Sequence, residues 1–249
     1  MPIFDDGSME NRQIGGTGFG FSAKRIADLG ASEYTLVSIA VDATGSVNGW
    51  STEMEKAIKA VVRSCRVSPR ADNLMLRVVT FNSSTGVHEV HGFKPLSECP
   101  EDNYNGTIVP RGMTNLFDAA FSCAGSMNEY GEALSKQDFG VNGIFVVLTD
   151  GEDNASKTTP NMLREEIAKG VSGEHLESVV SILVGVNVSE PRMAKYLASF
   201  KTEGNFTQYV ELADATESKL AKLANFVSKS ISAASQALGT GGPSQALTF

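Results

Sequence analysis

The stretch Val37-Ser38-Ile39-Ala40-Val41-Asp42-Ala43-Thr44-Gly45-Ser46 contains an apolar, β-rich run that ends in an aspartate. Two hydroxyl residues, Thr44 and Ser46, follow that aspartate two and four positions later. A buried strand that ends here delivers a carboxylate and two hydroxyls into one loop. Magnesium and calcium prefer oxygen ligands, so the loop is typical of half a site for a hard cation. The pattern also resembles the start of a phosphotransfer site, and the flanking sequence has to decide between the two.

Strands and helices alternate along most of the chain. Apolar segments predict strands at 34–42, 74–81, 87–91, 144–149, 179–185 and 206–212. Apolar residues at helical spacing predict helices at 50–65, from 114 onward, at 161–169, at 191–200 and from 214 onward. The alternation predicts an α/β fold with a Rossmann-like, open, mostly parallel sheet of about six strands, one an antiparallel edge strand, and helices on both faces. Such sheets bind ligands beyond the carboxyl ends of their strands.

The composition is typical of a soluble protein, with 41% hydrophobic and 20% charged residues among 249. A net charge of −8 argues against nucleic acid as a partner, and no apolar run approaches the roughly 20 residues of a membrane span. Met1 to Ser32 show no secretory signal, so we expect a cytoplasmic protein, while a virion protein or one exported by a non-classical route remains open. The three widely spaced cysteines predict buried thiols.

Both ends of the chain lack periodicity. Residues 1–32 include Gly15-Gly16-Thr17-Gly18-Phe19-Gly20 and predict a glycine-rich N-terminal arm. The GxGxxG spacing and the preceding strand of a nucleotide site are both missing from this run. The run Gly239-Thr240-Gly241-Gly242-Pro243 predicts a flexible C-terminal tail over residues 236–249. The folded domain is therefore expected at residues 33–235.

Two further loops offer oxygen ligands. Arg111-Gly112-Met113-Thr114-Asn115-Leu116 puts a threonine hydroxyl at a predicted helix start, and Leu148-Thr149-Asp150-Gly151-Glu152 puts a second carboxylate at a strand end. Together with the first loop, these motifs resemble the von Willebrand factor A (VWA) domain family and its metal-ion-dependent adhesion site (MIDAS). The family pattern is Asp-x-Ser-x-Ser in the first loop, a threonine in the second and an aspartate in the third. The resemblance covers roughly residues 33–235.

This resemblance implies a metal site made of Asp42, Thr44, Ser46, Thr114 and Asp150. It further implies that the hydroxyls touch the ion directly, that some carboxylates act through water, and that an acidic group of a partner fills the sixth position. The expected ion is Mg²⁺, with Ca²⁺ or Mn²⁺ as alternatives. Thr44 replaces the usual serine, and Met113 replaces the commoner glycine, but neither change removes a ligand.

The favoured function is a non-enzymatic, cation-dependent protein-binding module of adaptor or adhesion type, whose partner presents an Asp or Glu to the metal. Intracellular members of the family often serve as adaptors for MoxR-type AAA+ ATPases, which makes such an ATPase a candidate partner. A structural or assembly component of a virion or surface apparatus is the alternative with the same fold. A haloacid-dehalogenase-like magnesium phosphotransferase is a further hypothesis, although those enzymes carry a second aspartate where this chain has Thr44.

Residues beside the motifs have ordinary structural explanations. Trp50, the only tryptophan, directly follows the first loop and is expected to begin the apolar face of a helix. Asp118 lies one turn into the helix after Thr114, where we expect it to be exposed to solvent. Glu152, Asp153 and Asn154 form an acidic loop, which we expect to be a solvated turn.

Overall fold

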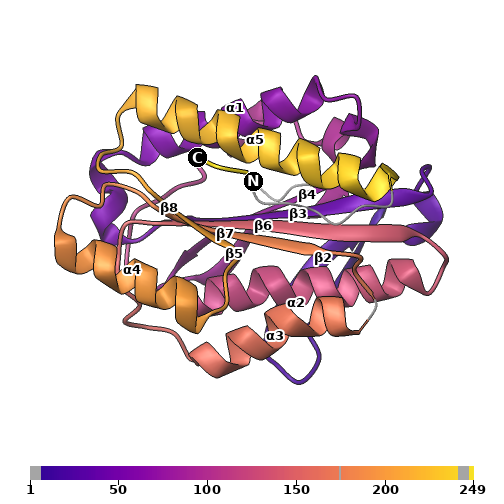
Figure 1. The fold of residues 1–249 in the computed structure, drawn as a ribbon, viewed down its shortest axis with the longest axis horizontal. Helices are drawn as coiled ribbons and strands as arrows, with labels where there is room; N and C mark the ends of the chain where they lie inside the picture. The colour runs from indigo at the N-terminus through magenta and orange to yellow at the C-terminus, as the bar shows by residue number, and fades with distance from the viewer. Residues whose placement is uncertain (1–6, 174, 241–246) are drawn as a thin grey trace.

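The computed structural model describes residues 7–173, 175–240 and 247–249. These residues form an eight-stranded sheet in the order β1-β2-β5-β4-β3-β6-β7-β8, with helices on both faces (Figure 1). The strands are β1 Met9–Gln13, β2 Gly20–Lys24, β3 Glu33–Asp42, β4 Leu74–Asn82, β5 Gly86–Pro95, β6 Gly140–Thr149, β7 Val179–Gly185 and β8 Gln208–Glu211. The α-helices are α1 Ser51–Arg66, α2 Leu116–Ser135, α3 Pro160–Ser172, α4 Pro191–Glu203 and α5 Glu217–Thr240.

The sheet is mostly parallel. Strand β3 pairs in parallel with β4 on one side and with β6 on the other, and β7 and β8 continue the parallel order. Strand β5 runs antiparallel to β4. The predicted α/β class with a mostly parallel sheet and helices on both faces is thereby confirmed.

Two apolar cores lie on the two faces of the sheet, because successive side chains of a strand point to opposite faces. Val37, Ile39 and Val41 of β3 face the core that α1 and α5 cover. Leu36 and Ala40 face the second core, which α2, α3 and α4 cover (Figure 1). Strand β3 is buried from Tyr34 to Asp42, which explains its nearly continuous apolar sequence.

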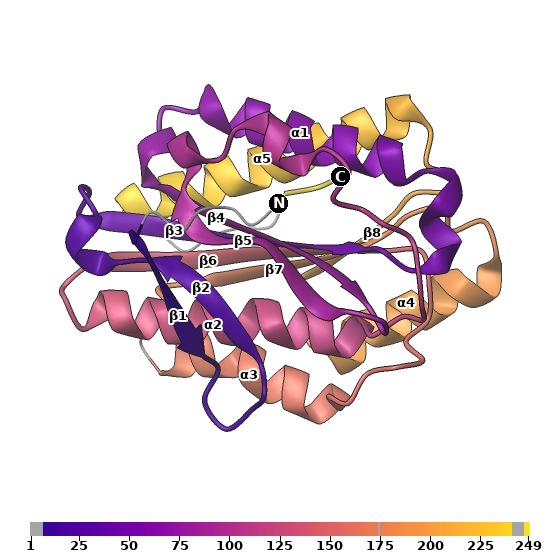
Figure 2. The ribbon, with the colours of Figure 1, turned by 180° about the vertical axis from the view of Figure 1, so that it is seen from behind.

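The predicted N-terminal arm needs correction, because its residues 9–24 form the antiparallel hairpin of β1 and β2. Strand β2 pairs with β5 at Ala23 and Phe93, so the sheet has eight strands and β5 is not its edge. Figure 2 shows the hairpin lying alongside α2. Ile14 is buried at this contact, and a Cβ added to Gly125 of α2 would come within 2.7 Å of its side chain. Local sequence patterns missed the hairpin, because its apolar contacts lie about a hundred residues away along the chain.

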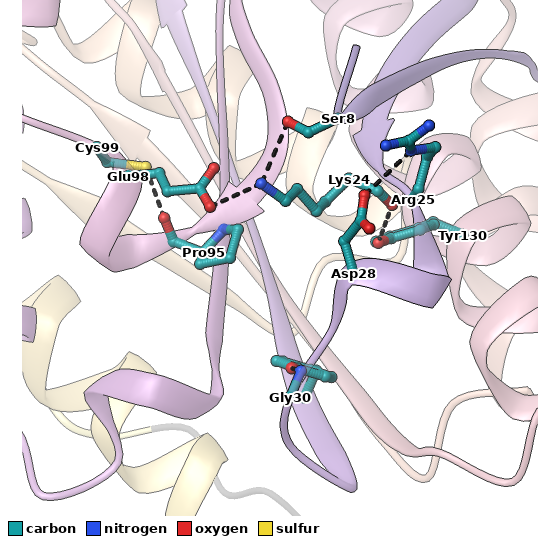
Figure 3. Close-up of polar contacts among 10 residues, drawn as sticks. Ser8, Lys24, Arg25, Asp28, Gly30, Pro95, Glu98, Cys99 and Tyr130 are labelled. Atoms are coloured by element: carbon teal, nitrogen blue, oxygen red, sulfur yellow. Dashed lines mark hydrogen bonds and ion pairs between the residues drawn. The ribbon is translucent and has the colours of Figure 1, made fainter. Parts of the chain in front are cut away.

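Polar contacts also attach the hairpin to the segment after β5 and to α2 (Figure 3). The Lys24 ammonium donates to Ser8 Oγ at 3.2 Å and to Glu98 Oε1 at 2.8 Å. Tyr130 of α2 donates its hydroxyl to the carbonyl of Lys24 at 2.7 Å. These contacts make residues 9–24 part of the folded body.

The predicted C-terminal tail is also partly ordered. Residues 236–240 complete α5, while residues 241–246 lie outside the described residues. Leu247 and Phe249 pack against the core that α1 and α5 cover, and the Phe249 ring meets the Phe226 ring edge-on. That residues 33–235 make up one VWA-like domain stays a prediction.

The described residues contain no helix that is both long and apolar enough to cross a membrane. Cys65, Cys99 and Cys123 are buried free thiols, as the sequence predicts.

Candidate metal centre

The first and third predicted metal loops meet at the reversal of strand order between β3 and β6. Asp42 is the last residue of β3, and Asp150 directly follows Thr149, the last residue of β6. The two strands pair in parallel up to Val41 and Leu148, so both aspartates lie at one edge of the sheet. This is the place where an open α/β sheet binds ligands.

A chain of oxygen atoms links the first loop to the third. Thr44 Oγ1 lies 2.9 Å from Ser46 Oγ, and Ser46 donates its hydroxyl to Asp150 Oδ1 at 2.7 Å. Ser46 is exposed and Asp150 is half-buried, so the Ser46–Asp150 end of this row of oxygen atoms is accessible to solvent. Two hydroxyls and one carboxylate thus converge from separate loops on one exposed point.

Asp42 lies beneath that point and is fully buried. Its Oδ1 accepts the backbone N–H of Thr44 at 2.9 Å, and its Oδ2 accepts the hydroxyl of Thr149 at 2.6 Å. Burial raises the pKa of Asp42 to about 6, although the hydrogen bonds from Thr149 and Thr44 favour the ionised carboxylate. Burial also raises the pKa of Asp150, against the hydrogen bond from Ser46. A nearby cation would stabilise both carboxylates in their charged form.

The second loop is hydrogen-bonded to the first, which brings Thr114 toward the same point. The N–H groups of Arg111 and Gly45 donate to the carbonyls of Ala43 and Gly112, at 2.9 and 3.3 Å. Gly112 has φ +69°, and a Cβ there would lie 2.6 Å from Ser84 Oγ, so glycine is required.

Thr114 Oγ1 itself borders the third loop. A Cβ added to Gly151 would lie 3.3 Å from this hydroxyl oxygen. The structure therefore gathers the five predicted site residues from three loops at one edge of the sheet.

The second and third loops also cap each other. Helix α2 has no side-chain cap of its own, and its first N–H groups are bonded by the third loop instead. Asp153 Oδ1 accepts from Phe117 N at 3.3 Å, and Ser156 Oγ accepts from Asp118 N at 3.1 Å. Asn154 Oδ1 accepts from Thr114 N, just before the helix, at 2.8 Å. In return, Asp118 Oδ1 accepts the N–H groups of Lys157 and Thr158 at 3.0 and 2.8 Å. These reciprocal bonds hold Thr114 in a fixed position relative to Asp150.

One of the expectations for neighbouring residues was wrong, because Asp118 is buried rather than exposed. Residues 152–154 are partly or fully exposed, as expected of a solvated turn, but Asp153 also caps the first turn of α2. Sequence reasoning also missed Thr149 as a partner of Asp42, because the two residues are 107 positions apart. Trp50 is buried in the core beside α1, as expected.

The donor set suits a hard cation. In the described part of the chain no three His, Cys, Asp or Glu side chains come close enough to hold an ion. The centre instead combines two carboxylates with hydroxyl groups, and Mg²⁺ and Ca²⁺ prefer such oxygen ligands. Two carboxylates would leave an ion short of ligands and able to accept a further acidic one.

No model of a known protein family matches this chain. No curated protein sequence matches it either.

Solved structures do share its fold. A pilus adhesin, SpaC from Lactobacillus rhamnosus GG, is 11% identical with a TM-score of 0.59, over 81% of this chain and 31% of the adhesin. The PilB minor pilin from Streptococcus sanguinis, as a D319A mutant, is 14% identical with a TM-score of 0.57, over 88% of this chain and 66% of the pilin. Proximal thread matrix protein 1 from the mussel byssus, with a zinc-occupied MIDAS motif, is 18% identical with a TM-score of 0.53, over 80% of this chain and 46% of the matrix protein.

At these identities the likeness concerns the fold alone. The chain spans from about a third to two thirds of the length of these proteins. The fold is thus one that adhesion and matrix proteins use, and one of those proteins binds a divalent metal at a MIDAS motif.

Proposed function

We propose that this chain is a non-enzymatic, divalent-cation-dependent protein-binding module of the VWA type, whose ion captures a carboxylate of a partner protein. The observation that carries the proposal is the oxygen chain from Thr44 through Ser46 to Asp150 at an exposed edge of the sheet. Thr114 borders the same point from a third loop. An ion held by few carboxylates keeps positive charge, which an Asp or Glu from another protein neutralises.

The donor chemistry supports Mg²⁺ as the ion. Magnesium takes oxygen ligands and is usually held by one or two carboxylates together with several waters. The Thr44–Ser46 and Ser46–Asp150 oxygen pairs, 2.9 and 2.7 Å apart, are hydrogen-bonded to each other, so a bound ion would replace these bonds.

The setting of Asp42 favours binding over phosphoryl transfer. A nucleophilic aspartate needs a free oxygen facing its substrate. Both oxygens of Asp42 accept hydrogen bonds, and the residue is fully buried. Thr44 occupies the position where a general acid would be required. We therefore assign Asp42 to orienting the first loop and to the charge balance of the ion.

Exposed apolar side chains around the centre support a protein as the partner. Val109 and Met113 of the second loop are 52% and 56% exposed. They flank Arg111 and Gly112 directly beside the first metal loop. Apolar side chains exposed next to a polar site are typical of protein-interaction surfaces.

Binding of Mg²⁺ and of a short acidic peptide tests the proposal. The probes are MgCl₂ and the peptide acetyl-Gly-Asp-Gly-amide, followed by calorimetry and by chemical-shift changes of the protein amides. We expect the peptide to bind with Mg²⁺ and not with EDTA. We expect Asp150→Ala to lose both the ion and the peptide.

Asp28→Asn is the matched control. It removes an exposed carboxylate that precedes the amino end of β3, whereas the centre lies at the carboxyl end of this strand. This variant should bind like the wild type. Peptide binding that persists in EDTA or in Asp150→Ala would refute the metal-bridged mechanism.

An assembly component is the second candidate, and it is favoured by the pilin and thread-matrix proteins that share the fold. In that case a second copy of the chain or another subunit supplies the carboxylate. Sedimentation of the purified chain with Mg²⁺ and with EDTA distinguishes the two, because only self-assembly increases the mass. A cytoplasmic adaptor role for a MoxR-type AAA+ ATPase stays a prediction from the resemblance alone.

A further inference from the structure

Arg111 differs from every other arginine in the described part of the chain. Its guanidinium forms no hydrogen bond or ion pair there, and its side chain is exposed. The other arginines bind carboxylates or backbone carbonyls: Arg12 with Glu10, Arg25 with Asp28, Arg63 with Glu101, Arg66 with Cys99, Arg70 with Glu33, Arg77 with Glu89, Arg164 with Glu203 and Arg192 with Glu152. Among the described residues, Arg111 is thus the arginine whose guanidinium no other protein group satisfies.

The backbone of Arg111 lies beside the metal centre. The N–H of Arg111 donates to the carbonyl of Ala43 at 2.9 Å, between Asp42 and Thr44. The side chain lines a hollow of about 480 Å³ between the β4–β5 turn and the loop at 103–111. The metal centre and this hollow therefore share a border at Ala43.

The lining of the hollow favours an anion. Besides Arg111 it includes the exposed His88 and neutral polar side chains of threonine and asparagine. Glu89 is the only acidic residue among the lining residues, and its carboxylate is already bound by other side chains. Its Oε1 accepts from buried Arg77 at 2.6 Å, and its Oε2 accepts from the N–H and hydroxyl of Ser22 at 3.0 and 2.8 Å. Arg111 is thus the uncompensated charge in this hollow.

We propose that the partner segment is diacidic, with one carboxylate on the ion and a second one on Arg111 in the adjoining hollow. This inference rests on the proposed function and names the chemistry of its partner. A guanidinium presents a planar fork of donors that matches a carboxylate in two parallel hydrogen bonds. The two positive groups also form a local attractive field on a chain of net charge −8, which steers acidic segments to this edge.

Pairs of short peptides test the two-point contact. Each acidic probe carries an Asp in a glycine background and a Glu one, two or three positions later, and its twin carries Gln in place of Glu. With Mg²⁺ and wild-type protein, we expect at least one Glu peptide to bind about threefold to fivefold more tightly than its Gln twin, as an exposed ion pair permits. In Arg111→Gln this preference should fall to about onefold, while the Gln twin still binds.

Lys157→Gln is the matched control, because it removes an exposed cation from the other hollow that borders the second loop. It should keep the preference for Glu. A preference that survives in Arg111→Gln, or that Lys157→Gln removes, would overturn the inference and leave the proposed function intact. Diacidic binding that ignores EDTA but needs Arg111 would overturn the two-point contact. Absence of any Mg²⁺-dependent binding would overturn the proposed function and this inference together.

Discussion

Replacing Thr149 by valine tests how the metal centre is built. The Thr149 hydroxyl donates to Asp42 Oδ2 at 2.6 Å, and both side chains are fully buried. Hydrogen bonds to a charged group contribute about 1.5–3 kcal/mol. Valine has the same branched shape and keeps the strand preference, so the change removes this hydrogen bond and the one that the hydroxyl accepts from Gly151 N–H at 3.2 Å. We expect Thr149→Val to lower the free energy of unfolding by about 1.5–3 kcal/mol at pH 7.5.

Thr35→Val is the matched control on the neighbouring strand β3. Thr35 is also fully buried, but its hydroxyl has no hydrogen-bond partner among the described residues. A buried hydroxyl without a partner costs free energy, so valine here should be neutral or stabilising by about 1 kcal/mol. The same chemical change is thus expected to have opposite or clearly different effects at the two positions.

Urea unfolding in EDTA measures both free energies, with equal slopes as the check that unfolding stays two-state. Titration with MgCl₂ then measures the effect on the ion. We expect Thr149→Val to bind Mg²⁺ at least about tenfold more weakly, because Asp42 loses the bond that orients it. Equal free-energy changes in the two variants, or unchanged affinity for Mg²⁺ in Thr149→Val, would refute the reasoning.

Three further predictions concern the ion, the hairpin and pH. Mg²⁺ at ten times its Kd should stabilise the wild type by about 1.4 kcal/mol and raise its Tm by about 3–6 °C, with no shift for Asp150→Ala in the same thermal scan. Ile14→Ala should lower the free energy of unfolding by about 2–5 kcal/mol. Gly125→Ala should be less destabilising in the Ile14→Ala background than alone, because its methyl group then occupies the space that Ile14 left. Additive changes in urea unfolding would rule out the contact. Burial lowers the pKa of His91 to about 4, so between pH 6.5 and 4 the unfolded chain binds a proton at His91 that the folded chain does not. The free energy of unfolding should therefore fall by about 3 kcal/mol over this range. His91→Gln should lack this part of the pH dependence when both proteins are unfolded in urea across the same pH series.

Much of the fold could be read from local patterns. The nearly continuous apolar residues of β3 and β6 reflect burial on both faces of a parallel sheet, and each strand's own sequence shows this pattern. The spacing of Met54, Ile58 and Val62 in α1 reflects one buried helix face in the same way. The hairpin of β1 and β2 has no comparable signal. Its short strands are stabilised by contacts with β5 and α2, and these contacts are not visible in its own sequence.

The sequence by itself determined which oxygen-bearing side chains stand at strand ends and helix starts: Asp42, Thr44, Ser46, Thr114 and Asp150. Only the tertiary structure decided how they are held and what surrounds them. It brought Thr149 to Asp42, bonded Asp118 to the third loop, and left the Arg111 guanidinium without a partner among the described residues. The physical reason is separation along the chain. A strand end is encoded by its own residues, whereas a hydrogen bond across 40 or 107 positions depends on the register of the whole sheet.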